Sequence, residues 1–131
     1  MKMFNKMFVY EALKRSVTYD PDKKIQSGEP SIGQDTLVSL LIHDIFGAEI
    51  LKTHTNKNWH FYNRIDGEVV DFTMNETKKS EDSSVFENIP STPDETSVYV
   101  DQSDYSTFLM SFVRAFEETV GLDKHRFGLA N

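Results

Sequence analysis

The sequence constrains its fold most tightly at Asp66-Gly67, a dipeptide that lies between two runs rich in β-branched and aromatic residues. A two-residue loop of type I′ needs a positive φ at both positions, and Asp-Gly is one of the few pairs that accept it. The sequence therefore predicts a β-hairpin closed by this loop. In the resulting register, Tyr62 faces Asp71 across the two strands.

Because side chains alternate along a strand, this hairpin has one polar and one apolar face. On the polar face, Asp71 is a diagonal neighbour of His60, roughly 7–8 Å away by backbone and within side-chain reach. We therefore expect the two side chains to interact, provided that the turn is assigned correctly. The residues expected on the apolar face, against the core, are Trp59, Phe61, Ile65, Val70 and Phe72.

A dense apolar run at residues 37–42 follows Asp35 and predicts a buried central helix over residues 35–46. A polar residue that opens a buried helix, followed by a His and an Asp on a hairpin, is the layout of a hydrolase with a cysteine nucleophile. Here the residue at the helix start is Asp35, and the whole chain contains no cysteine. A thiol mechanism is therefore excluded.

Several of these segments resemble the YunG-like family of small bacterial proteins. That family typically shows Gly-Gln-Cys at the start of a helix, a Gly-Gly-Glu-Ile strand, a Trp-His-aromatic-Asn run and an Asp-aromatic-Thr. The matching segments are Gly33-Gln34, residues 47–51, residues 59–64 and residues 71–73, with Glu11-Ala12-Leu13 and Ser16 upstream. The resemblance covers the first half of the chain well and the rest loosely. It implies a papain-like or transglutaminase-like core in which Asp35 replaces the family's cysteine.

The other elements complete an α+β fold that we expect to form a single domain, residues 1–131. It would have a papain-like core with a central buried helix packed on a small antiparallel sheet, flanked by N- and C-terminal helices. The remaining expected elements are helices at residues 4–17 and from Asp104 to Gly121, a strand at residues 48–53, and an acidic surface loop at residues 75–96 anchored by Val85-Phe86. If the chain has a last strand, we expect it at residues 97–100.

Composition excludes several classes of function. The formal net charge of −7 argues against binding to nucleic acid or to an anionic membrane surface. No apolar run approaches the ~20 residues that span a bilayer, and the N-terminus lacks the apolar core of a signal peptide. We therefore expect a cytoplasmic protein, with no cofactor because no phosphate-binding glycine loop is present.

Each candidate site residue has more than one interpretation. Asp35 is either a helix N-cap or a carboxylate facing His60 in a former nucleophile position, and both can hold together. Asp35, His60 and Asp71 are the candidate positions of a degenerate catalytic triad, and Gln34 could donate a hydrogen bond to an oxyanion. The same three side chains could bind a hard cation, whereas zinc would need a further nitrogen such as that of His54.

Three functions remain open at this point. The leading hypothesis is a non-catalytic relative of a cysteine hydrolase, with a polar cleft that binds a peptide, a protein or a small ligand. The second is a hydrolase that uses Asp35 and His60 as an acid–base pair, with or without a metal ion. The third is a structural or assembly protein that acts through its acidic surface.

Overall fold

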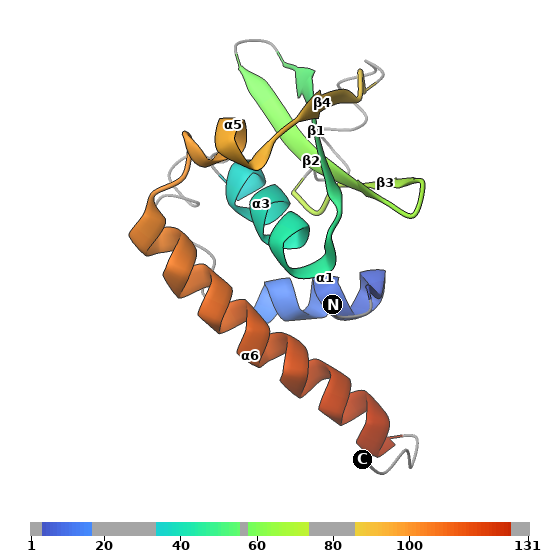
Figure 1. Cartoon of the computed structure of the whole chain (residues 1–131). Coiled ribbons are helices and arrows are strands. Elements are labelled where there is room, and N and C mark those ends of the chain that lie inside the picture. Colours follow the sequence, from blue (N-terminus) through green and yellow to red (C-terminus); the bar gives the residue numbers. More distant parts are fainter. Residues whose placement is uncertain (1–3, 17–33, 56–57, 74–85, 127–131) are drawn as a thin grey trace. The chain divides into compact units, whose positions relative to one another are not determined.

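The computed structural model describes residues 4–16, 34–55, 58–73 and 86–126 (Figure 1). Its helices and strands are α1 (Lys6–Arg15), α3 (Gln34–Phe46), β1 (Glu49–His54), β2 (Trp59–Ile65), β3 (Glu68–Val70), β4 (Ile89–Ser91), α5 (Pro93–Ser97) and α6 (Gln102–Arg126). The predicted α+β class, with a small antiparallel sheet and helices at both ends of the chain, is confirmed. The chain divides into two compact units, one holding α3, α5 and the sheet and the other holding α1 and α6. The expectation of a single domain stays a prediction.

The sheet of the first unit contains the predicted hairpin at one of its edges. Its strand order is β3-β2-β1-β4, and all three neighbouring pairs are antiparallel. The loop residues Asp66 and Gly67 have φ values of 52° and 81°, so both adopt the positive φ that a type I′ turn requires. Ile65 pairs with Glu68 across the turn, which confirms the register deduced from the sequence.

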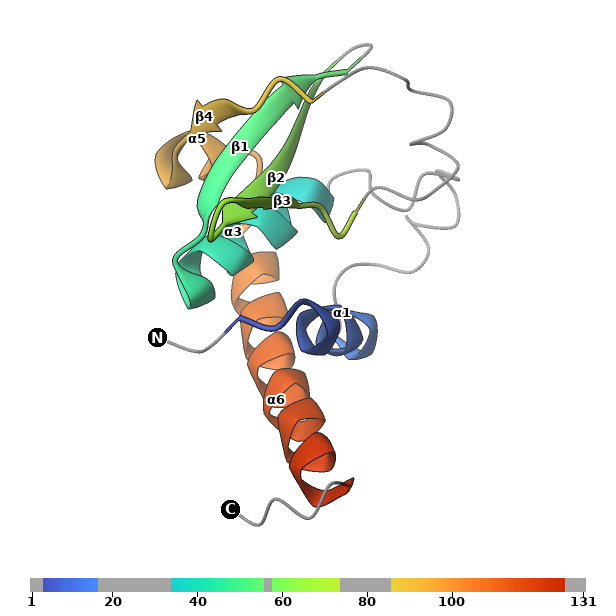
Figure 2. The ribbon, with the colours of Figure 1, turned by 90° about the vertical axis from the view of Figure 1, so that its right-hand side faces the viewer.

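Helix α3 packs against the sheet, mainly against β2 (Figure 2). It is buried along most of its length, as its apolar sequence predicts. Gly47 ends the helix with a φ of 75°, and its amide donates to the carbonyl of His43 at 2.9 Å. Asn63 connects helix and sheet, because its side-chain amide donates to the carbonyls of Ser39 at 3.0 Å and of Glu49 at 3.1 Å. The bond to Ser39 holds the second turn of α3 beside β2.

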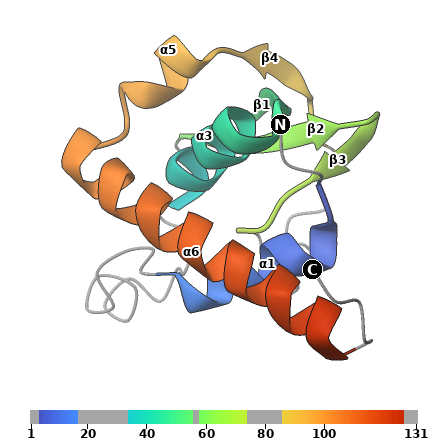
Figure 3. The ribbon, with the colours of Figure 1, turned by 60° about the horizontal axis from the view of Figure 1, so that its bottom comes forward.

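The second unit pairs α1 with α6 (Figure 3). Helix α1 begins after Asn5, whose side-chain oxygen accepts from the amide of Phe8 at 3.0 Å. The predicted limits of the C-terminal helix are wrong, because α6 begins at Gln102 and continues through Gly121 to Arg126. A single glycine only weakens a helix interior, by about 1 kcal/mol relative to alanine, so it does not end a helix whose neighbours favour it.

The segment after the hairpin also differs from expectation. Residues 89–91, in the predicted acidic loop, form β4, and residues 93–97 form α5. The last strand expected at residues 97–100 does not form, because Ser97 ends α5 and residues 98–100 lie in a turn. Thr92 caps α5 by accepting from the amide of Glu95 at 3.1 Å, and Pro93 occupies its first turn. Thr92-Pro93-Asp94-Glu95 has the Ser/Thr-x-x-Glu spacing of a helix start, a signal that the sequence reading missed. Residues 75–85 of the predicted loop lie outside the described residues.

Within the described ranges, no helix is long and apolar enough to cross a bilayer.

Candidate functional site

Three charged side chains meet at the edge of the sheet, and we call them the buried trio: Asp35, His60 and Asp71. Asp35 lies in the first turn of α3, His60 lies in β2, and Asp71 directly follows β3. His60 Nε2 lies 2.6 Å from Asp71 Oδ2, and His60 Nδ1 lies 3.4 Å from Asp35 Oδ2. The side chains of the trio are only 6–12% exposed. The predicted contact of His60 with both carboxylates is confirmed.

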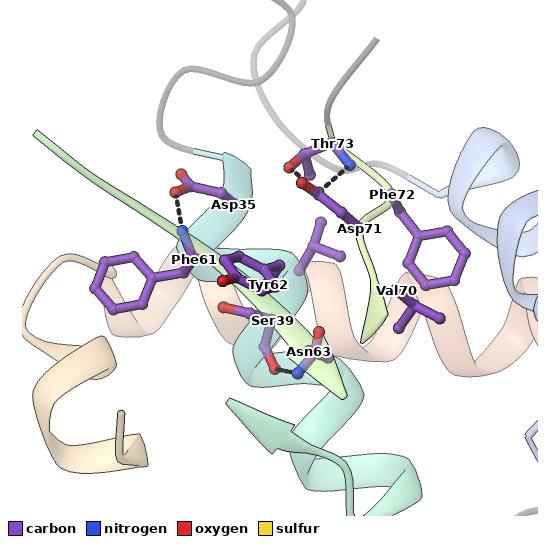
Figure 4. A pocket seen from close by; sticks show the side chains of 10 residues that line it. Asp35, Ser39, Phe61, Tyr62, Asn63, Val70, Asp71, Phe72 and Thr73 are labelled. Atoms are coloured by element: carbon purple, nitrogen blue, oxygen red, sulfur yellow. Dashed lines mark hydrogen bonds between the residues drawn. The ribbon is translucent and has the colours of Figure 1, made fainter. Parts of the chain in front are cut away.

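Asp71 is held by the residues that follow it. Its second oxygen, Oδ1, accepts from the backbone amide of Thr73 at 3.0 Å and from the hydroxyl of Thr73 at 2.9 Å (Figure 4). A carboxylate that bonds to the backbone two residues ahead forms a local turn. This turn leaves Oδ2 directed at His60, so the Asp-aromatic-Thr sequence serves to orient one carboxylate oxygen.

Asp35 has a different anchor from the one expected of a helix cap. Helix α3 begins at Gln34, so Asp35 lies inside the first turn and not ahead of it. Its Oδ2 accepts from the backbone amide of Phe61, in β2, at 2.8 Å (Figure 4). Phe61 follows His60, so the same oxygen faces both the strand backbone and the imidazole. The carboxylate therefore joins α3 to β2.

The electrostatics of the trio favour the imidazolium. Burial opposes the charged form of His60, but the hydrogen bonds and negative charges of Asp35 and Asp71 outweigh it and raise the pKa of His60 from 6.5 to about 9. Burial alone would raise the pKa of Asp71, yet the hydrogen bond and charge of His60, together with Thr73, hold that pKa below its ordinary 3.8. At neutral pH His60 is therefore a cation that faces a carboxylate on each ring nitrogen.

This charge state limits the chemistry of the site. An imidazolium has no free lone pair, so it neither accepts a proton nor binds a metal ion. Among the described residues, no group of three or more acidic and imidazole side chains has the arrangement of a metal site. His54, the proposed fourth ligand, instead lies 2.9 Å from Glu87 through its Nδ1 and stacks on Trp59.

Gln34 is buried at 7% exposure in the first turn of α3. Its role as a hydrogen-bond donor to an oxyanion stays a prediction.

The outer face of the hairpin carries contacts that the sequence reading missed. Tyr62, two residues after His60 and on the same face, is 1% exposed. The ring of Phe86 lies 4.5 Å from that of Tyr62 and 6.0 Å from that of His60, centroid to centroid. The proposed Val85-Phe86 anchor is half described, since Val85 lies outside the described residues. The apolar pair Val85-Phe86 within an acidic segment was the one sequence feature that indicated a contact of this segment with the core.

A small recess lies on the α3 side of the trio. It holds about 140 Å³ of space including open solvent, well below the ~300 Å³ at which ligand pockets begin. The recess is therefore too small to be a site for a drug-sized molecule. Its lining residues are Asp35, Val38, Ser39, Phe61, Tyr62, Asn63, Val70, Asp71, Phe72 and Thr73 (Figure 4).

Comparison with known proteins identifies the family. Residues 6–117 match the family model described as "YunG protein", and the chain belongs to this family. It is 33% identical over 102 residues to "Uncharacterized protein YunG" from Bacillus subtilis (strain 168). The alignment covers 78% of this chain and 86% of the relative. No solved structure matches the chain.

Proposed function

We propose that this protein is a non-catalytic relative of the cysteine hydrolases, with a papain-like core, and that it acts by binding a peptide, a protein or a small ligand. One observation carries the proposal. Asp35 Oδ2 lies 3.4 Å from one ring nitrogen of His60, and Asp71 Oδ2 lies 2.6 Å from the other. A helix-borne nucleophile, a base on a strand and a third group that orients the base have this order in a catalytic triad.

The core around the trio supports the same relationship. A buried central helix presents its first turn to the antiparallel strand that carries the histidine. In a hydrolase of this layout, a cysteine at the helix start would face the imidazole. Asp35 occupies that position here, and its carboxylate is also engaged by the amide of Phe61. The former nucleophile position is thus filled by a group that ties the helix to the sheet.

The charge of the trio explains why we assign no catalysis. A general base must be largely unprotonated near the working pH, and a pKa of about 9 keeps His60 protonated at neutral pH. The same argument opposes an acid–base hydrolase built on Asp35 and His60. The trio instead forms a fixed polar unit with two negative charges and one positive charge. It stabilises the edge of the sheet beside which a ligand would bind.

The substitution Asp35→Cys tests the proposed ancestry of the site. The new thiol would lie in the first turn of a helix and beside an imidazolium, and both features lower a thiol's pKa. We expect it to react with iodoacetamide at about pH 6 much faster than an ordinary thiol, whose pKa is ~8.5. Adding His60→Ala should remove most of that advantage. The measurement is the alkylation rate as a function of pH.

A surface cysteine provides the matched control. Met110 is 73% exposed on α6, so Met110→Cys should show an ordinary pH profile. The same ordinary profile for Asp35→Cys, with no dependence on His60, would overturn the proposal. The non-catalytic part is tested separately by a screen of the unmodified protein against amide and ester substrates. Turnover that disappears in Asp35→Asn would contradict it.

A further inference from the structure

A short segment covers the outer face of the hairpin directly before β4. We call Phe86, Glu87 and Asn88 the strap. The ring of Phe86 lies over Tyr62 and His60, while Glu87 and Asn88 are exposed to solvent. Tyr62 and His60 are only 1% and 7% exposed. The outer approach to the imidazole therefore runs past the strap.

One end of the strap is fastened to Tyr62. The phenol hydroxyl donates to Asn88 Oδ1 at 2.9 Å and accepts from the backbone amide of Asn88 at 2.9 Å. Burial raises the pKa of Tyr62, so the hydroxyl stays protonated and can donate. Both bonds depend on a single oxygen atom, and the loss of that atom would release both together.

The middle of the strap is fastened to β1 through Glu87. Its backbone amide donates to Thr53 Oγ1 at 3.0 Å. Its carboxylate Oε1 accepts from the hydroxyl of Thr53 at 3.1 Å and from the backbone amide of His54 at 2.7 Å. The imidazole of His54 adds a contact of 2.9 Å to the same oxygen. Side chains supply at least one partner in each of these bonds.

The backbone separates the strap from the strand that follows it. The pairing of β4 with β1 runs from Ile89 to Ser91, opposite Lys52 to Ile50. Asn88 has a φ of 55°, a left-handed conformation that interrupts an extended strand and that asparagine tolerates better than most residues. The strap thus begins where the regular pairing ends. The strap is held by bonds to side chains and not by strand pairing, and segments outside regular pairing open at lower cost than paired strands.

We propose that the strap is a gate that opens as a local unit and exposes the His60–Tyr62 face of the hairpin. Its opening leaves the sheet intact, because β4 remains paired to β1. The uncovered face presents the aromatic ring and the hydroxyl of Tyr62. The group of a ligand that replaces Phe86 on this face is therefore aromatic. That the exposed face receives a ligand rests on the binding role proposed above. The opening itself is independent of it.

Amide hydrogen exchange tests the gate in the full chain. In the unmodified protein, the Glu87 amide should exchange faster than the amides of the β1–β2 pair, with little dependence on low concentrations of denaturant. In Tyr62→Phe the Glu87 amide retains its own acceptor, Thr53. We expect its exchange to accelerate about tenfold, because the two bonds to Asn88 are lost. The β1–β2 amides should exchange as before.

A pair of surface variants gives a second test in case Tyr62→Phe folds poorly. Glu87→Gln weakens the contacts to His54 and should accelerate the Asn88 amide, whereas Glu49→Gln, a matched change at another exposed glutamate, should not. The proposal would be overturned if the Glu87 and Asn88 amides exchanged at the same rate, and with the same dependence on denaturant, as the β1–β2 amides. The strap would then be part of the sheet. A failure of Asp35→Cys to gain reactivity leaves these results unaffected.

Discussion

The two ends of β2 carry charged contacts of opposite character. At one end, His60 lies between two carboxylates, and its side chain is 9% exposed. At the other end, Arg64 forms a bidentate pair with Glu49, with Nε and one terminal nitrogen each 2.9 Å from a carboxylate oxygen. These side chains are 34% and 58% exposed. Geometry alone would rank the arginine pair at least as high as the histidine contacts.

Burial reverses that ranking. A bidentate pair on the surface exchanges one set of partners for water at little net cost, and salt screens it. A buried charge that loses its partner has no water to replace it, so the remaining groups carry the full penalty. His60 and Arg64, four residues apart on one strand, therefore contribute differently to stability because the first is buried and the second is exposed.

The largest expected effect is that of His60→Ala. It removes the cation from between Asp35 and Asp71 and leaves two buried carboxylates close to each other. We expect a loss of about 3–5 kcal/mol in the free energy of unfolding at pH 7, measured by urea denaturation. The control is His43→Ala, which removes a single hydrogen bond to the carbonyl of Ala48 and should cost about 1 kcal/mol. Equal losses in the free energy of unfolding of the two variants would contradict the prediction that the trio stabilises the fold more than a single hydrogen bond does.

The next effect is the dependence of stability on pH. The folded-state pKa of His60 is raised above its unfolded value, so its stabilising contribution is full below about 6.5 and is lost as pH rises through about 9. The shift corresponds to about 3 kcal/mol between those limits. The lowered pKa of Asp71 acts at the other end, where stability falls as acid protonates that carboxylate below 3.8. The two shifts reflect one interaction and are not summed.

Urea denaturation at pH 6 and pH 9.5 measures this dependence. His60→Gln serves as the matched control, because it retains a polar side chain that does not titrate. The alkaline loss of stability should be smaller in the control. An alkaline loss of the same size in both proteins would show that other groups cause it.

The smallest effect is expected at the exposed end of the strand. Glu49→Gln removes the charge of the surface pair, and the hydrogen bond from Arg64 already lowers the pKa of Glu49. Because both side chains face solvent, we expect a change in the urea midpoint within experimental error at 0.15 M salt. A loss comparable to that of His60→Ala would remove the distinction between the two ends of β2.

The sequence allowed the hairpin and the central helix to be predicted because local rules determine both. Asp66-Gly67 selects one turn type, and the turn fixes the register that brings His60 and Asp71 together. The apolar run after Asp35 left a buried helix as the simplest reading. The contact of Asp35 with His60 was expected from these two elements together with the resemblance to the YunG-like family.

Other features could not be predicted because long-range contacts or competing local signals determine them. The fastening of Asn88 to Tyr62 joins residues 26 positions apart, and neither position carries a periodic pattern. Strand β4 has only three residues and includes Pro90, which usually argues against a strand and is tolerated here at the edge of the sheet. Glycine often ends a helix, so the sequence predicts an end at Gly121, but α6 continues through that residue.

A trio that holds His60 as a cation leaves the imidazole unable to act as a general base at neutral pH. A proton NMR titration of the His60 ring tests this claim most directly. We expect His60 to titrate near pH 9, well above the ~6.5 of an unperturbed histidine, and we expect Asp71→Asn to move the midpoint down. A midpoint at or below 6.5 would contradict the account, because His60 would then be neutral at pH 7 and free to accept a proton.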